Sequence, residues 1–255
     1  MKYNLYIIGK KVIKSIFLGE RGLKMKKEEK KYLLTHPQKR IWIEEKINNT
    51  LGYNTLLPMI TIDENIDLEI MEKAINIVIK NNDAMRTKIC EVDGIPYQSF
   101  RKYEYEKIDY FDFSSSDNNA ELEGVIEKMC NSKFEVLDSK LYYFSIIKIN
   151  NNTSGILLKI HHIIADTSTV SIIFNNIMDY YYKLQSNIVL DNIKKDSYIS
   201  FIEDESQYKG SEKFNLDNKY WIDKLSDSEC NGDIGIKKFG SNLYKVKSID
   251  YDIPE

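Results

Sequence analysis

The stretch Ile160-His161-His162-Ile163-Ile164-Ala165-Asp166 decides the fold that we expect of this chain. An apolar run from 155 to 162 precedes it in strand-like order, and a helical period from 168 to about 184 follows it. Neighbouring side chains on a strand point to opposite faces, so one imidazole can face a pocket while the other packs inward. Backbone N–H groups at the start of a helix can stabilise an anion, and a histidine nitrogen can carry a proton. The stretch therefore predicts a site for acid–base chemistry.

A purely structural explanation competes with this interpretation. Two buried histidines could satisfy backbone carbonyls, while Asp166 caps a helix that begins near Thr167 or Ser168. For an isolated histidine pair the structural explanation is the better one, because most single motifs are false positives. The segments on either side of the pair therefore have to decide between the two.

Working outward, the sequence predicts helices and strands in alternation. A strand from 141 to 150 leads through the turn-forming Asn151-Asn152-Thr153-Ser154 into the histidine strand. The other expected elements are a helix capped by Thr35 and ending at Asn48, a strand from 54 to 63 with Pro58 at an edge or bulge, an amphipathic helix from Asp67 to Asn81, a hairpin from 85 to 100 turning at Asp93-Gly94, and helices at 119–131, 198–207 and 211–225. This order predicts an α/β fold, a mixed sheet covered by helices.

Composition excludes several classes of partner. The chain has 255 residues with 42% hydrophobic side chains, enough for a substantial core, and its 36 basic and 39 acidic residues nearly cancel. Such a balance produces no strong overall electrostatic field that would attract nucleic acid. The sequence has no run of about 20 apolar residues that would predict a membrane span, and it predicts no export signal. The cysteines lie far apart without metal-ligand spacing, which favours free thiols in a cytoplasmic protein and no bound metal: Cys90, Cys130 and Cys230.

The histidine stretch resembles the HHxxxDG motif of the condensation domains of nonribosomal peptide synthetases and their chloramphenicol-acetyltransferase-like relatives. Three further segments match the family in order and spacing. The family's LTxxQxRxW segment is matched by Leu34-Thr35-His36-Pro37-Gln38-Lys39-Arg40-Ile41-Trp42. Its RHExLRT segment is matched by Asn82-Asp83-Ala84-Met85-Arg86-Thr87, with Met85 in place of leucine. Its YWxxxL segment is matched by Tyr220-Trp221-Ile222-Asp223-Lys224-Leu225. Taken singly, Gln38 and Arg40 could be solvated and both tryptophans ordinary core residues. Together the four segments make the resemblance specific over about residues 30 to 225.

The resemblance implies a chloramphenicol-acetyltransferase-like fold whose second lobe is truncated. Family members place their reaction channel between two similar lobes, and this sequence ends at Glu255, soon after the second lobe should begin. The expected organisation is an N-terminal extension at 1–29, a condensation-domain N-terminal lobe at 30–188, and a helical connection with the start of an incomplete C-terminal lobe at 189–255. One wall of the channel would then come from elsewhere.

The resemblance also implies a role for each site residue. His162 is expected to face the channel as general base or to position the nucleophile, while His161 supports the loop. Asp166 is expected to form a buried ion pair with Arg86 that holds this loop. Thr167 stands where the family has glycine, and its side chain is expected to crowd the substrate and to impair turnover.

The expected activity is the joining of an acyl or peptidyl thioester, held on a carrier protein, to an amine. Both substrates would arrive on phosphopantetheine arms of peptidyl or acyl carrier proteins, so the chain itself would bind no cofactor. A separately encoded second lobe or self-association could complete the channel. Two alternatives keep the fold: a truncated, noncatalytic module that binds carrier proteins, and an oligomeric acyltransferase that uses coenzyme A.

Overall fold

The computed structural model describes residues 30–47, 54–115, 120–190 and 197–226. These residues fall into two compact units that divide between Glu205 and Ser206. The first unit contains the sheets and the histidine pair. The second contains the end of one helix and the whole of another, and each unit is described by itself.

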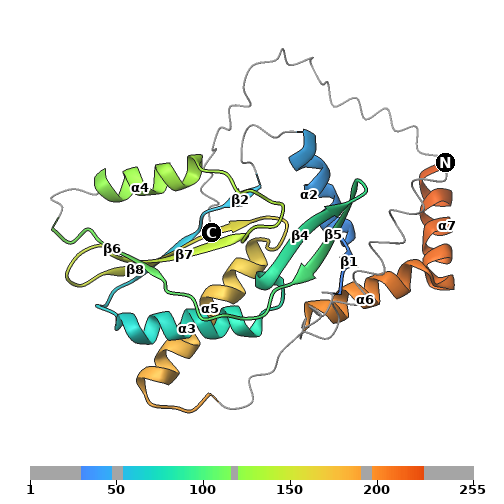
Figure 1. The fold of residues 1–255 in the computed structure, drawn as a ribbon. Helices are drawn as coiled ribbons and strands as arrows, with labels where there is room; N and C mark the ends of the chain where they lie inside the picture. The colour runs from blue at the N-terminus through green and yellow to red at the C-terminus, as the bar shows by residue number, and fades with distance from the viewer. Residues whose placement is uncertain (1–29, 48–53, 116–119, 191–196, 227–255) are drawn as a thin grey trace, which may run out of the picture. The chain divides into compact units, whose positions relative to one another are not determined.

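The main sheet of the first unit places the histidine strand at its centre (Figure 1). Strand β8 pairs with β7 on one side and with the short strands β2 and β3 on the other, all antiparallel, and β6 runs parallel to β7 at the edge. The strands are β2 (Thr55–Leu56), β3 (Met59–Ile62), β6 (Asp109–Asp112), β7 (Tyr142–Lys148) and β8 (Ser154–His161). Pro58 divides the expected strand at 54–63 into β2 and β3, since proline cannot donate to a ladder. Its carbonyl accepts the N–H of Leu158 at 2.9 Å.

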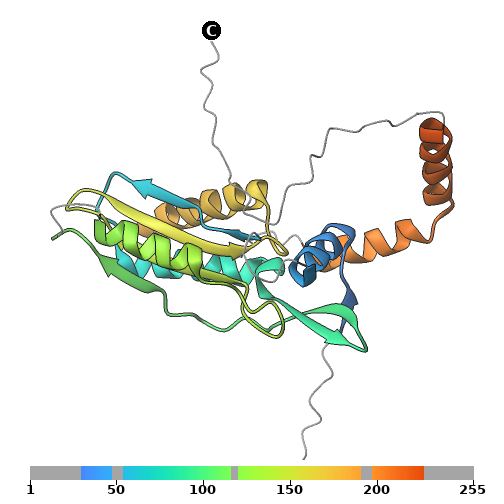
Figure 2. The ribbon, with the colours of Figure 1, turned by 90° about the horizontal axis from the view of Figure 1, so that it is seen from above.

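Helices cover both faces of this sheet (Figures 1 and 2). Helices α3 (Leu68–Asn81) and α5 (Thr167–Gln185) pack together on one face, and α4 (Ala120–Asn131) lies on the other. The alternation of β8 sorts its side chains accordingly. Ile156, Leu158 and Ile160 join the large core with α3 and α5, whereas Leu157 joins the small core under α4. The predicted mixed sheet covered by helices is confirmed.

A second sheet carries the predicted hairpin. Its strands are β1 (Tyr32–Leu33), β5 (Ile95–Phe100) and β4 (Thr87–Val92), in that order, and the short 3-10 helix η1 (Ala84–Arg86) leads into β4. Asp93 and Gly94 turn the hairpin with φ angles of 51° and 78°. Two positive φ values in a two-residue turn match the twist of the flanking strands, which is why Asp-Gly predicted the hairpin correctly.

Three further helices complete the described residues: α2 (His36–Ile47), α6 (Tyr198–Lys209) and α7 (Glu212–Ser226). Helix α2 begins at His36, directly after the predicted cap Thr35, whose backbone N–H donates to the side-chain oxygen of Gln38 at 2.9 Å. That contact is one half of a capping box. The division between the two units falls inside α6, and the expected boundaries at 29/30 and 188/189 stay predictions.

Candidate active site

His161 ends β8 as a buried residue. Its side chain is only 2% exposed, and its ring meets the edge of Phe134 with centroids 5.8 Å apart. Nε2 lies 3.3 Å from Oε1 of Glu45, and Nδ1 accepts the backbone N–H of Ile163 at 3.1 Å. Burial lowers the pKa of His161 because the charged imidazolium loses its water, and the nearby Glu45 carboxylate opposes this shift. His161 is therefore the inward-facing member of the pair.

His162 is the half-buried member, which agrees with the prediction that the two rings would differ. Its backbone N–H donates to the carbonyl of Asn54 at 2.7 Å. Nδ1 is buried and has no hydrogen-bond partner among the described residues. Of the two ring nitrogens, Nδ1 is therefore closed to solvent.

Asp166 caps helix α5. Its Oδ1 accepts the backbone N–H and the hydroxyl of Thr169, both at 2.7 Å, and these hydrogen bonds lower the pKa of the carboxyl group. Capping was the structural explanation for this residue, and the geometry is that of an N-cap. Thr167 follows as the first residue of α5, exposed and without a positive φ. The backbone here does not require glycine, while the expected effect of Thr167 on turnover stays a prediction.

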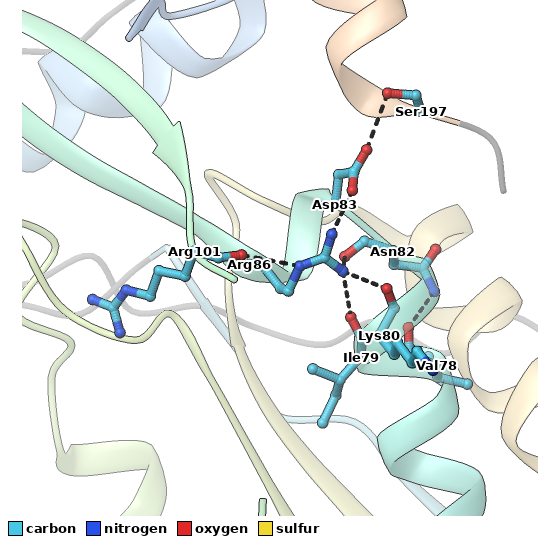
Figure 3. A network of polar contacts seen from close by, with 8 residues as sticks. All are labelled: Val78, Ile79, Lys80, Asn82, Asp83, Arg86, Arg101 and Ser197. Atoms are coloured by element: carbon cyan, nitrogen blue, oxygen red, sulfur yellow. Dashed lines mark hydrogen bonds and ion pairs between the residues drawn. The ribbon is translucent and has the colours of Figure 1, made fainter. Parts of the chain in front are cut away.

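The predicted ion pair between Arg86 and Asp166 is wrong. Arg86 pairs instead with Asp83 at 2.6 Å (Figure 3). Asp166 is exposed and engaged at the start of α5. The rest of the guanidinium group donates to backbone carbonyls at the end of α3 and to one at the end of β5: Ile79 at 2.9 Å, Lys80 at 2.6 Å, Asn82 at 3.3 Å and Arg101 at 3.1 Å. The last carbonyls of a helix lack partners within it, and a cation is favoured at that end. Arg86 therefore binds the nearest unpaired acceptors.

A buried amide pair joins the second sheet to the histidine turn, and sequence reasoning missed it. Gln38 of α2 and Gln98 of β5 exchange two hydrogen bonds of 3.0 and 2.8 Å, and Gln38 Nε2 also donates to the carbonyl of Ile163 at 3.3 Å. Both glutamines are buried, whereas Arg40 is exposed as a solvated residue would be. The position of Gln38 in LTxxQxRxW was the available signal.

The other predicted features can be placed only in part. Cys90 and Cys130 are free thiols, and Cys230 lies outside the described residues. Within the described ranges, no three His, Cys, Asp or Glu side chains gather as a metal site would need. None of the helices seen in those ranges combines the length and the apolar composition that a membrane crossing requires.

Comparison with known proteins settles the family. The condensation domain family model matches residues 28–234. The chain belongs to the condensation domain family. Among its relatives, one of the subunits of plipastatin synthase from Bacillus subtilis (strain 168) is 31% identical over 194 residues, covering 76% of this chain and 8% of the relative. Surfactin synthase subunit 1 of the same organism is 30% identical over 198 residues, covering 74% and 5%.

Solved condensation domains share the fold. The starter condensation domain of rhizomide synthetase matches with a TM-score of 0.72 at 17% sequence identity, over 77% of this chain and 50% of that one. The first condensation domain of the calcium-dependent antibiotic synthetase matches with a TM-score of 0.68 at 14% identity, over 78% and 50%. The chloramphenicol-acetyltransferase-like fold is confirmed. The chain spans about half the length of these solved domains.

Proposed function

We propose that this condensation domain transfers an acyl or peptidyl group from a thioester to an amine, with His162 as the residue that acts on the reacting atoms. The observation that carries the proposal is the placement of His162. The residue stands directly after the central strand and is half-buried, its backbone N–H donates to Asn54, and its Nδ1 is buried without a partner among the described residues, which leaves Nε2 for the reaction. The other imidazole of the pair is turned inward.

The chemistry requires a group that handles one proton. An attacking ammonium must lose a proton before its nitrogen can form the new bond to the thioester carbonyl, and an imidazole accepts protons near neutral pH. In either expected role, base or positioning group, His162 would use Nε2. We infer that the thioester and the amine are presented on phosphopantetheine arms of carrier proteins. The chain itself would bind and orient these substrates and take a proton from the amine.

A complete channel needs a second wall. The solved domains extend over a further half that this chain does not cover. We infer that residues 1–255 turn over slowly without the second lobe, because positioning contributes a large share of such rate enhancements. A second lobe or a second copy of the chain would complete the channel.

The test is an acyl-transfer assay by mass spectrometry with acyl- and aminoacyl-loaded carrier proteins. Residues 1–255 are assayed alone and together with a second condensation-domain lobe. Product should form in the complete system, and His162→Ala should lower the rate by roughly 10²- to 10⁴-fold, the range for losing an acid–base group. His36→Ala is the matched control, because His36 is the exposed histidine of α2 and its loss should leave the rate unchanged.

The outcomes separate the candidate functions. Wild-type turnover by the His162→Ala complex would remove the catalytic assignment. Robust turnover by the isolated monomer would remove the incomplete channel. Carrier-protein binding without product under every condition would favour the noncatalytic module, and turnover with coenzyme A thioesters by an oligomer would favour the coenzyme A-dependent acyltransferase.

A further inference from the structure

His162 lies in a tight turn whose hydrogen bonds come from its neighbour. The N–H of Ile164 donates to the carbonyl of His161 at 3.1 Å, and the N–H of Ile163 donates to Nδ1 of the His161 ring at 3.1 Å. The side chain of His161 therefore takes part in the turn as a backbone acceptor would. The direction in which His162 leaves the strand depends on this bond.

The contact with Ile163 fixes where the His161 ring carries its proton. A backbone N–H can only donate, so Nδ1 must present a lone pair, and the proton of the neutral ring must be on Nε2. Burial lowers the pKa of His161, which favours the neutral ring. The Nε2–H group then needs an acceptor in a buried place, and the Glu45 carboxylate lies 3.3 Å away.

Glu45 is also tied to the backbone of His162. Asn54 Nδ2 donates to Oε1 of Glu45 at 2.8 Å, and the carbonyl of Asn54 accepts the N–H of His162 at 2.7 Å. One carboxylate oxygen on α2 thus contacts the ring of His161 and, through Asn54, the main chain of His162. The Glu45 side chain is 22% exposed, so the ionised carboxylate keeps part of its contact with water while it serves both partners.

We propose that Glu45 is a positioning residue of this active site. It holds His161 in the Nε2–H tautomer, and the Nδ1 lone pair that remains closes the turn that orients His162. The functional consequence rests on the proposed role of His162 in acyl transfer, whereas the tautomer and the turn can be tested without any turnover.

Loss of the carboxylate should release both parts of this arrangement. Without an acceptor, the buried Nε2–H group would be unsatisfied, and the Nε2–H tautomer would keep only the hydrogen bond from Ile163 in its favour. In the Nδ1–H tautomer the ring would direct a donor at the N–H of Ile163, which is itself a donor. That hydrogen bond would break and the turn would open.

The first test reads the tautomer directly. The chain has 3 histidines, so ¹⁵N-labelled imidazole signals can be assigned with one substitution at a time. The wild-type chain should show His161 with the proton on Nε2 and a slowly exchanging Ile163 amide. Glu45→Leu should shift the His161 nitrogens toward the other tautomer and speed exchange of the Ile163 amide at least about tenfold. Glu45→Gln keeps a side-chain oxygen acceptor and should retain the wild-type spectrum.

The second test is kinetic and uses the acyl-transfer assay with the complete system. Glu45→Leu should lower kcat by roughly 10- to 100-fold with KM nearly unchanged, because a small misplacement of a catalytic group costs rate more than binding. Glu45→Gln should restore most of kcat. Glu44→Leu is the matched control, because Glu44 is the exposed neighbour on the same helix, and it should behave as wild type.

Each result decides for or against the proposal. A wild-type His161 with its proton on Nδ1 overturns it, as does Glu45→Leu with an unchanged tautomer and unchanged Ile163 exchange. A normal kcat in a variant with the altered tautomer overturns the positioning role. If the wild-type system makes no product at all, the proposed function fails while the spectra still decide the role of Glu45. Should Glu45→Leu not fold, Glu45→Ala takes its place, since alanine favours the helix.

Discussion

Replacing Arg86 by lysine should destabilise the first unit through the end of α3. The guanidinium group uses Nε, Nη1 and Nη2 to reach one carboxylate and four backbone carbonyls, and its side chain is only 15% exposed. An ammonium group can keep the contact with Asp83 and one carbonyl, but it cannot span both the end of α3 and the end of β5. At least two hydrogen bonds from a charged donor are therefore lost.

The expected cost follows from those two bonds. A hydrogen bond to a charged group contributes about 1.5 kcal/mol at the lower end of its range, and water can reach part of this site. We expect the free energy of unfolding to fall by about 2–3 kcal/mol, which lowers Tm by about 5–10 °C in a domain of this size. Arg40→Lys is the matched control, because Arg40 is exposed on α2, and it should change stability by less than about 0.5 kcal/mol.

Double-mutant cycles measured by urea denaturation identify the partner of Arg86. Arg86→Met removes the ion pair, so combining it with Asp83→Asn should cost less than the sum of the single changes, because the two side chains share a 2.6 Å contact. Arg86→Met combined with Asp166→Asn should be additive. Coupling with Asp166 and none with Asp83, or an unchanged Tm in Arg86→Lys, would refute this account.

Two further predictions concern the buried polar groups around the histidine turn. The folded state lowers the pKa of His161, whose neighbours with ionisable side chains are Glu45 and His162. Below about pH 6.5 the unfolded chain therefore binds more protons than the folded chain does. The free energy of unfolding should be independent of His161 above that pH and should fall below it, by at most about 1.4 kcal/mol per pH unit. In urea titrations, His161→Asn should remove this dependence of the free energy of unfolding on pH. Gln98→Met should lower the free energy of unfolding by about 1–3 kcal/mol, since it leaves the buried amide of Gln38 with fewer partners. The double variant Gln38→Met, Gln98→Met should lose less than the two single variants added together. Additive losses in that pair would show that the two amides act independently.

Local sequence signals predicted most elements of this fold. Asp67 caps α3 where the sequence placed it, and Asp93-Gly94 turns the expected hairpin, because caps and turns depend on neighbouring residues. Strand β6 was not predicted, since its four residues gain their partner only by pairing in parallel with β7. The exposed Trp221 of α7 was equally unreadable, because its segment differs little from that of the buried Trp42.

The sequence predicted the difference in burial between the two histidines but not the residues that contact them. The family motif identified His161 and His162, and alternation along a strand foresaw that their rings would differ in burial. Glu45 lies 116 residues from His161 along the chain, and no spacing rule links the two. Arg86 was assigned to a distant aspartate by resemblance, although unpaired carbonyls only a few residues away were the closer partners. Side-chain pairs between distant segments can be identified only from the three-dimensional structure, whereas helices and strands can be predicted from the periodicity of the sequence.

The central position of β8 in the sheet also affects how this protein folds during its synthesis on the ribosome. Ile62 of β3 finds its partner Ser154 roughly 90 residues later, at about 5–20 residues per second of synthesis. For about 5–20 s the apolar face of α3, with Met71, Ile75 and Val78, has no sheet to cover it. Nascent chains of this domain should therefore be clients of ribosome-associated chaperones until β7 and β8 emerge, and translation pauses before residue 142 should lower the yield of folded protein.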